Sequence, residues 1–405
     1  MGPRSGPIGT AAAHAASAPA IAFAGLAALA VAMGIGRFAF TPILPMMQHD
    51  RGLTVADGAW LASANYLGYL LGAVSVAALA RRVQPAAGIR GSLLVIGMAT
   101  LGMGIEARFV GWVVLRAVAG IATAWVLVFT SAWCLEQLAP ARRPVLNGMV
   151  FAGVGTGIVV AGGFCLILMQ SRATSAQAWI GLGMLSLVGT AVIWRTFDAG
   201  ATARMDEGRR STAIEWHWDA DSVRLVACYG AFGFGYIIPA TFLPAMARRV
   251  IHDPSVFGWA WPVFGGAAAA STLAAAVWSR LIGNRRLWLL GHVVMAFGVA
   301  VPVWWPGIAS IMIAALLVGG TFMAITLAGM QEARALAAPQ AARLMAAMTS
   351  AFAAGQIAGP ICVGYLVGRD ADLSKPLLTA CLVLLVSAGG LLRWRRRDRV
   401  RWRHR

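Results

Sequence analysis

The chain has 405 residues, of which 59% are hydrophobic and 12% charged, with a mean hydropathy of +0.74. Soluble domains carry about 25% charged residues, so this composition excludes an ordinary soluble protein and predicts an integral membrane protein. The formal net charge of +18 would also suit a nucleic-acid-binding protein. The positions of the basic residues therefore decide between these two classes.

Apolar runs of roughly 20 residues are long enough to cross a bilayer as helices. Such runs predict twelve transmembrane helices and hence an all-α membrane protein. The first six spans are 20–46, 58–80, 92–105, 110–135, 146–169 and 178–197. The second six are 223–247, 256–280, 287–305, 307–330, 344–368 and 376–392. The first run is too long for the core of a cleaved signal peptide, so we expect it to remain as a span.

The first predicted span contains MGIGRFAFTPILPMM, residues 33–47, in which Arg37 is the one charged residue. A charge near the bilayer centre costs about 2.5 kcal/mol or more, so Arg37 should face the protein interior or a wet cavity. A guanidinium there can clamp a substrate carboxylate or phosphate through two parallel hydrogen bonds. Alternatively, Arg37 locks helices together by donating to backbone carbonyls or to a carboxylate near a helix end.

The second and fourth spans add two further polar residues, Asn65 and Arg116. Asn65 lies at a depth similar to Arg37, with Tyr69 one turn on, and either contacts substrate or bonds neighbouring helices. Arg116 either contributes to a positive cavity or pairs with Glu106 across the short outer turn between the third and fourth spans. All fifteen Asp and Glu residues lie in loops or near span ends, which favours an anionic or polar substrate.

The second half of the chain repeats the first at a constant offset of 199 residues. Gly34, Gly36, Leu44, Pro45, Met47 and Trp60 fall on Gly233, Gly235, Leu243, Pro244, Met246 and Trp259. Arg37 itself falls on Tyr236. A duplicated membrane unit with an unduplicated charge predicts a transporter whose substrate cavity is asymmetric and lies between two related bundles.

The boundaries of this organisation follow from one long polar interruption at the midpoint. The predicted parts are a cytoplasmic amino-terminal segment (1–19), a six-helix bundle (20–197), a cytoplasmic linker (198–221), a second six-helix bundle (222–392) and a basic cytoplasmic tail (393–405). On the eleventh span, Gln356 lies near the middle of the membrane, where it either contacts substrate or bonds a neighbouring helix.

The basic residues are distributed as in a membrane protein with both termini in the cytoplasm. The predicted cytoplasmic segments, together with the cytoplasmic ends of the spans, hold 24 of the 33 Lys and Arg residues, the outer loops hold 7, and the interiors of the spans hold Arg37 and Arg116. This is the positive-inside bias, and it leaves no pattern that calls for nucleic acid. The arginine-rich tail should lie on the anionic inner leaflet of a bacterial inner membrane.

No motif for a cofactor, a metal or a catalytic reaction stands in a credible context. The five cysteines all fall in apolar spans without metal-ligand spacing, so we interpret them as packing residues. Glycine-rich pieces occur inside membrane helices and lack the strand-turn-helix setting that phosphate-binding or dinucleotide-binding motifs need. The sequence therefore predicts no enzyme, no cofactor and no metal site.

The chain resembles a major facilitator superfamily transporter, and most closely its YbfB/YjiJ branch. The resemblance is carried by GIGRFAFTPILPMM in the first span and WLASANYLGYLLGA in the second, and it covers nearly the whole chain. Arg116, three residues before AGIATA, is similar to the arginine-glycine motif of the fourth span in that superfamily. The inner loop ALARRVQPAAG departs from the superfamily pattern because it lacks the usual acid. The resemblance implies alternating access at a central cavity.

Together these features predict a monomeric secondary transporter of a small organic solute, anionic or zwitterionic, in the inner membrane. Arg37 would be the main anchor, Arg116 would tune the potential, and Asn65, Tyr236 and Gln356 would be polar contacts. The alternative is a non-transporting membrane receptor or scaffold on the same fold, which we would expect to carry an added signalling domain or a long interaction segment.

Overall fold

The computed structural model describes residues 16–79, 82–197, 218–250, 254–305, 307–366 and 373–392. Most of the predicted amino-terminal segment (1–19), most of the predicted linker (198–221) and the whole basic tail (393–405) lie outside these residues. The side chains of residues 241–260 also lie outside the described part of the chain, and with them Leu243, Pro244, Met246 and Trp259 of the sequence repeat.

Every regular element among the described residues is helical. In chain order they are α1 (Ala18–Leu29), η1 (Ala30–Arg37), α2 (Phe40–Asp50), α3 (Val55–Leu79), α4 (Pro85–Ile105), α5 (Phe109–Leu138), η2 (Ala139–Ala141), α6 (Pro144–Gln170), α7 (Ser175–Ile193), η3 (Trp194–Phe197), α8 (Ala220–Val250), α9 (Pro254–Ile282), α10 (Asn284–Trp304), α11 (Ile308–Ala337), η5 (Ala338–Gln340), α12 (Ala341–Leu366) and α13 (Ser374–Leu392).

Each of the twelve predicted spans overlaps at least one of these helices. Within the described residues, 11 helices are long and apolar enough to cross a membrane. The helix that overlaps the second predicted span, α3, has 25 residues and is not among these 11. The protein is therefore a multi-pass membrane protein, while the count of twelve spans stays a prediction.

The first predicted span, residues 20–46, is not one uniform helix. It consists of α1, the π-helical segment η1 and then α2, and Arg37 is the last residue of η1. The wider turn shows in the hydrogen bond from the Phe38 amide to the Met33 carbonyl, five residues back. Segments of this kind occur frequently at functional sites. Two glycines with low helix preference, Gly34 and Gly36, lie within it.

The repeat that the sequence shows at a few positions extends to the helix ends. Adding 199 to the bounds of α4, α5, η2 and α7 gives the bounds of α10, α11, η5 and α13. We therefore call α1–α7 the first half and α8–α13 the second half of the molecule.

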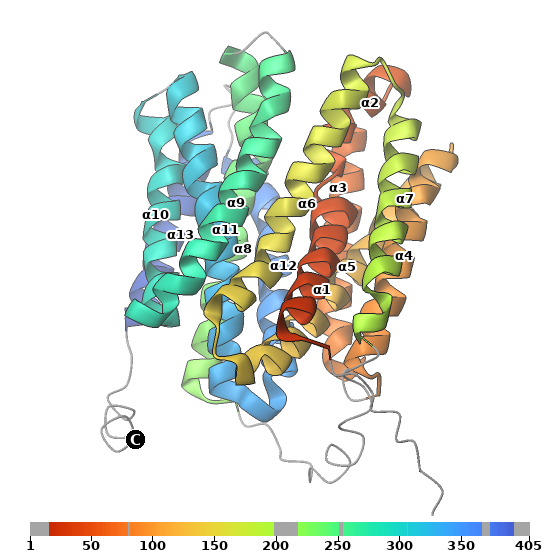
Figure 1. Cartoon of the computed structure of the whole chain (residues 1–405). Coiled ribbons are helices and arrows are strands. Elements are labelled where there is room, and N and C mark those ends of the chain that lie inside the picture. The colour runs from red at the N-terminus through yellow and green to blue at the C-terminus, as the bar shows by residue number, and fades with distance from the viewer. Residues whose placement is uncertain are drawn as a thin grey trace, which may run out of the picture.

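The two halves lie side by side. In Figure 1 the helices of the first half, red to yellow-green, stand on one side, while α8 to α11 and α13 stand on the other, with α12 between them. The halves meet where α6 packs on α9 and where α3 packs on α12. At the first contact a Cβ added to Gly155 would lie 2.5 Å from the carbonyl oxygen of Gly265, so small residues let α6 and α9 approach closely.

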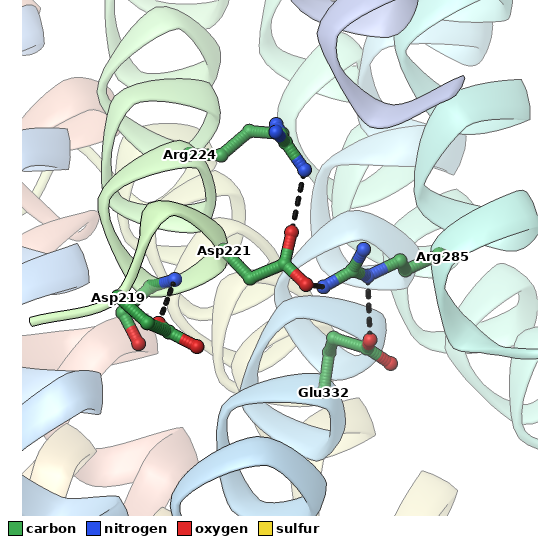
Figure 2. A network of polar contacts seen from close by, with 6 residues as sticks. Asp219, Asp221, Arg224, Arg285 and Glu332 are labelled. Carbon is green, nitrogen blue, oxygen red and sulfur yellow. Dashed lines mark hydrogen bonds and ion pairs between the residues drawn. The ribbon is translucent and has the colours of Figure 1, made fainter. Parts of the chain in front are cut away.

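The second half carries an ion-pair network at the end of the molecule where η3 finishes and α8 begins, which we call the linker end. Figure 2 shows Arg285 of α10 reaching toward Asp221 of α8 and Glu332 of α11. Its nitrogens lie 3.6 Å from Asp221 Oδ2 and 2.7 Å from Glu332 Oε1. This network ties the linker ends of three helices of the second half together.

Candidate functional site

Arg37 is buried in the interior with 3% of its surface exposed, so it does not face lipid. Its Nη2 donates a hydrogen bond to Oε1 of Gln356 on α12, which is 319 residues away in the sequence and is also buried. Two residues predicted separately from the sequence are therefore in direct contact. Because Arg37 belongs to the first half and Gln356 to the second, their hydrogen bond joins the two halves.

Two tyrosines of α3 pack on the Arg37 guanidinium. Its central carbon lies 4.0 Å from the ring centre of Tyr69 and 5.3 Å from that of Tyr66. A cation over an aromatic face is stabilised by about 2 kcal/mol or more when both groups are shielded from water. The rings thus hold the guanidinium in place without neutralising its charge.

The guanidinium keeps unused hydrogen-bonding capacity. Its Nε and Nη1 have no partner among the described residues, and neither does Nε2 of Gln356. An arginine side chain has five N–H donors in a planar fork, and Gln356 occupies one hydrogen of Nη2. Whichever Nη2 hydrogen that is, the other still forms a complete edge with either Nε or Nη1. The free edge has the donor geometry that a carboxylate accepts through two parallel hydrogen bonds.

Arg116 of α5 is buried as deeply as Arg37, but it points its donors at the backbone. Its Nη1, Nη2 and Nε lie 3.3, 3.5 and 3.4 Å from the carbonyl oxygens of Gly36, Arg37 and Leu61. The first two carbonyls stand where the π-helical segment gives way to α2. Backbone carbonyls at a helix irregularity inside a membrane need a donor from elsewhere in the protein. Arg116 supplies it and so fixes the backbone that carries Arg37.

The alternative in which Arg116 pairs with Glu106 is wrong. Oε1 of Glu106 accepts the backbone N–H groups of Arg108 and Ala107, each at 2.8 Å. These hydrogen bonds hold the pKa of Glu106 below its ordinary value. The turn between α4 and α5 therefore satisfies its own carboxylate locally, and Arg116 finds carbonyls on neighbouring helices instead.

Asn65 of α3 is buried and belongs to the same connection between helices. Its Nδ2 donates to the carbonyl oxygen of Arg116 at 3.0 Å, while its Oδ1 has no partner among the described residues. The hydrogen bond holds α3 against α5. This geometry matches the interpretation of Asn65 as a residue that bonds neighbouring helices.

Tyr236 of α8 is buried in a group of aromatic rings that lines the contact between the halves. Its ring stacks on Phe322 of α11 with centres 4.4 Å apart and lies 6.2 Å from Phe352 of α12. Phe38, the neighbour of Arg37, meets Phe322 edge-on at 6.0 Å. We call Phe38, Tyr236, Phe322 and Phe352 the ring cluster. Phe38, the residue next to Arg37, links the ring cluster to Arg37.

Sequence reasoning missed several members of these groups, among them Tyr66 and Phe322. Tyr66 had a usable signal, because it stands three residues before Tyr69 and so shares its face of the helix. Phe322 had none, since it is one of 16 phenylalanines in an apolar chain. Only the packing of α11 against α8 brings it to the site.

The comparison with known families supplies the class of protein. A family model described as "Uncharacterised MFS-type transporter YbfB" matches residues 29–392. The chain belongs to this family. The predicted resemblance is thereby confirmed, and all five candidate residues lie within the matched region. As a member of this MFS-type transporter family, the protein falls in a class that is generally not enzymatic.

Proposed function

We propose that this protein is a secondary transporter that moves a small organic anion or zwitterion across the membrane by alternating access. The observation that carries the proposal is the state of Arg37. It is a buried cation with no acidic partner among the described residues, and it keeps unused donors. An ionisable residue inside a membrane protein with such free capacity is most economically explained as a ligand-binding group.

The proposed movement uses the division into two halves. In the proposed arrangement twelve spans form two six-helix bundles. The bundles rock against each other at two contacts, that of α6 with α9 and that of α3 with α12. The hydrogen bond between Arg37 and Gln356 crosses this boundary, so a substrate carboxylate bound at Arg37 competes directly with a contact between the halves. Arg37 is then the anchor, Gln356 and Tyr236 are contacts from the second half, and Arg116 and Asn65 position the anchor.

We further propose that the protein acts as a monomer in the inner membrane with both termini and the central linker in the cytoplasm. The distribution of Lys and Arg along the chain supports this orientation. Reporter fusions at both ends and at residue 205 check it, and an outside location of any of the three contradicts it. The apparent mass of the purified protein in nanodiscs tests the monomer.

The anchor role is tested with Arg37→Lys and Arg37→Ala in purified protein. Flux of labelled organic acids and amino acids into proteoliposomes is measured beside the melting temperature. Lysine keeps the charge and loses the planar, bidentate donors, so we expect flux to fall at least tenfold for both variants while each protein still folds. The exposed Arg51→Ala is the matched control and should keep full flux. Full flux in a folded Arg37→Ala protein would rule out the anchor.

A further inference from the structure

We propose that the site takes an organic acid with one carboxylate and a flat, apolar body such as an aromatic ring. The inference rests on the proposed function and narrows its substrate class from anions and zwitterions in general. It is carried by the charges, the hydrogen bonds and the rings that surround Arg37.

The charge balance of the site fits one negative charge. Among the described residues, Arg37 and Arg116 are the two arginines buried within the spans. Arg37 has two nitrogens without a partner, whereas each of the three nitrogens of Arg116 donates to a backbone carbonyl. A second carboxylate on the substrate would thus be buried without a free cation. Burying an unpaired charge is strongly unfavourable, so the site discriminates against dicarboxylates.

The site also discriminates against a substrate with an ammonium group. Among the described residues Arg37 has no ion-pair partner, and Asp221 and Glu332 pair with arginines at the linker end of the second half. The ring face of Tyr69 that could have received a cation is already covered by the Arg37 guanidinium at 4.0 Å. An amino-acid ammonium would therefore meet a like charge where it needs an acid or an open aromatic face.

The surroundings of the anchor are aromatic in both halves. On the first half, Tyr66 and Tyr69 pack on the guanidinium. On the second half, Phe352 lies one helical turn before Gln356, and Tyr236 and Phe322 stack beside it. Binding sites for small molecules are largely apolar with a few placed polar groups, and aromatic rings prefer stacked or edge contacts with other rings. A planar body is the shape that these side chains can cover.

Gln356 explains how the carboxylate enters such a packed site. Its Oε1 is a neutral acceptor that occupies one donor of Arg37 when the halves meet. A carboxylate forms charge-assisted hydrogen bonds that are roughly twice as strong as those of a neutral acceptor. The substrate therefore displaces the amide oxygen, and the freed amide can donate through Nε2 to the carboxylate.

The test uses the full-length protein in nanodiscs with phenylacetate and benzoate as probes, measured by calorimetry and thermal stabilisation. We expect both to bind. Four comparison compounds should each bind about tenfold or more weakly, which is about 1.4 kcal/mol. These are acetate, which lacks the ring, phenylacetamide, which lacks the charge, phthalate, which adds a second carboxylate, and phenylalanine, which adds an ammonium. Tyr236→Leu should weaken phenylacetate more than acetate. Thr349→Val, on the same helix as Gln356, should leave both unchanged.

The possible failures are distinguishable. If phenylalanine or phthalate binds as tightly as phenylacetate and loses that binding in Arg37→Ala, the substrate class is overturned and the anchor survives. If phenylacetate binds a folded Arg37→Ala protein as tightly as the wild type, both the class and the anchor are overturned. If neither ring acid binds, the class is overturned, and the flux experiment on the Arg37 variants decides the anchor alone.

Discussion

The two halves of this transporter carry their charges at different depths. In the first half Arg37 and Arg116 are buried within the spans, and the positions 199 residues later are Tyr236 and Ala315. In the second half the ion pairs stand at the linker end, on Asp221, Arg285 and Glu332. The corresponding residues of the first half are Ala22, Ala86 and Trp133, all buried.

This difference shows which features of the repeat are constrained and which are not. Helix lengths are kept because a span must match the bilayer thickness in either half. Polar side chains are free to diverge, because each must only find a partner in its own surroundings. A site between such halves presents a cation on one side and aromatic rings with an amide on the other, which suits an asymmetric substrate with a charged end and an apolar end.

The two halves also differ at a pair of corresponding positions, Gly157 of α6 and Gln356 of α12. A Cβ added to Gly157 would lie 2.4 Å from the carbonyl oxygen of Ala30 and 2.8 Å from Cα of Gly34. Backbone atoms on both sides cannot move aside, so we expect Gly157→Ala to cost about 3 kcal/mol or more. Melting temperature and yield of folded protein measure the loss.

Gly163→Ala on the same helix is the matched control, because its added Cβ would meet nothing within 4 Å. We expect it to leave the melting temperature unchanged or slightly higher, since alanine favours helix over glycine by about 1 kcal/mol. Equal melting temperatures for the two variants would show that the first half has room at position 157 and would remove this distinction between the halves.

Replacing the two buried arginines should affect the stability of the protein to different degrees. Arg116→Ala leaves the carbonyls of Gly36, Arg37 and Leu61 without their donor, and we expect a loss of roughly 2–3 kcal/mol. Arg37→Ala removes a buried charge that has only one hydrogen-bond acceptor, so we expect a change within about 1 kcal/mol. Thermal unfolding of both variants in one detergent compares them. A larger loss of stability for Arg37→Ala than for Arg116→Ala would show that Arg37, and not Arg116, has the structural role.

The Gln356→Glu variant tests whether a carboxylate of the protein itself can take the place of the substrate carboxylate at Arg37. A carboxylate on α12 would neutralise Arg37 from within, so we expect binding of organic anions to weaken at least tenfold, or about 1.4 kcal/mol, without a fall in melting temperature. Gln356→Ala should retain binding, because the guanidinium then keeps more free donors. Tight anion binding by the folded Gln356→Glu variant would mean that the substrate does not bind the Arg37 Nη2 donor that Gln356 occupies.

The network at the linker end of the second half should matter little for ligand binding. Glu332→Gln weakens a pair whose side chains are 12% and 19% exposed, and we expect a loss of about 1 kcal/mol in stability. Phenylacetate affinity should not change. The double variant Arg285→Gln with Glu332→Gln should cost less than the sum of the two single variants. An altered affinity in any of these proteins would couple the linker end to the site.

Part of the candidate site could be predicted from single residues. Arg37 was identifiable because a cation in an apolar span has to face the interior, and its burial agrees. Gln356 and Tyr236 were identifiable as polar residues on apolar helices. Their partners were not, since helical periodicity indicates the face of a helix but not the helix that will cover it. The sequence left Arg116 with two alternatives. Its contacts rule out the pair with Glu106 and direct its nitrogens at backbone carbonyls, which neither alternative included.

The sequence by itself determined the class of protein, the approximate positions of its spans and the duplication of its halves. It could do so because backbone groups in lipid have no water to bond, which leaves a long apolar run few choices besides a helix. The tertiary structure alone decided that Arg37 meets Gln356 across 319 residues, that Arg116 serves backbone carbonyls, and that Phe322 stacks on Tyr236. These contacts depend on which helices become neighbours, and that is set by packing between distant segments and by no local pattern.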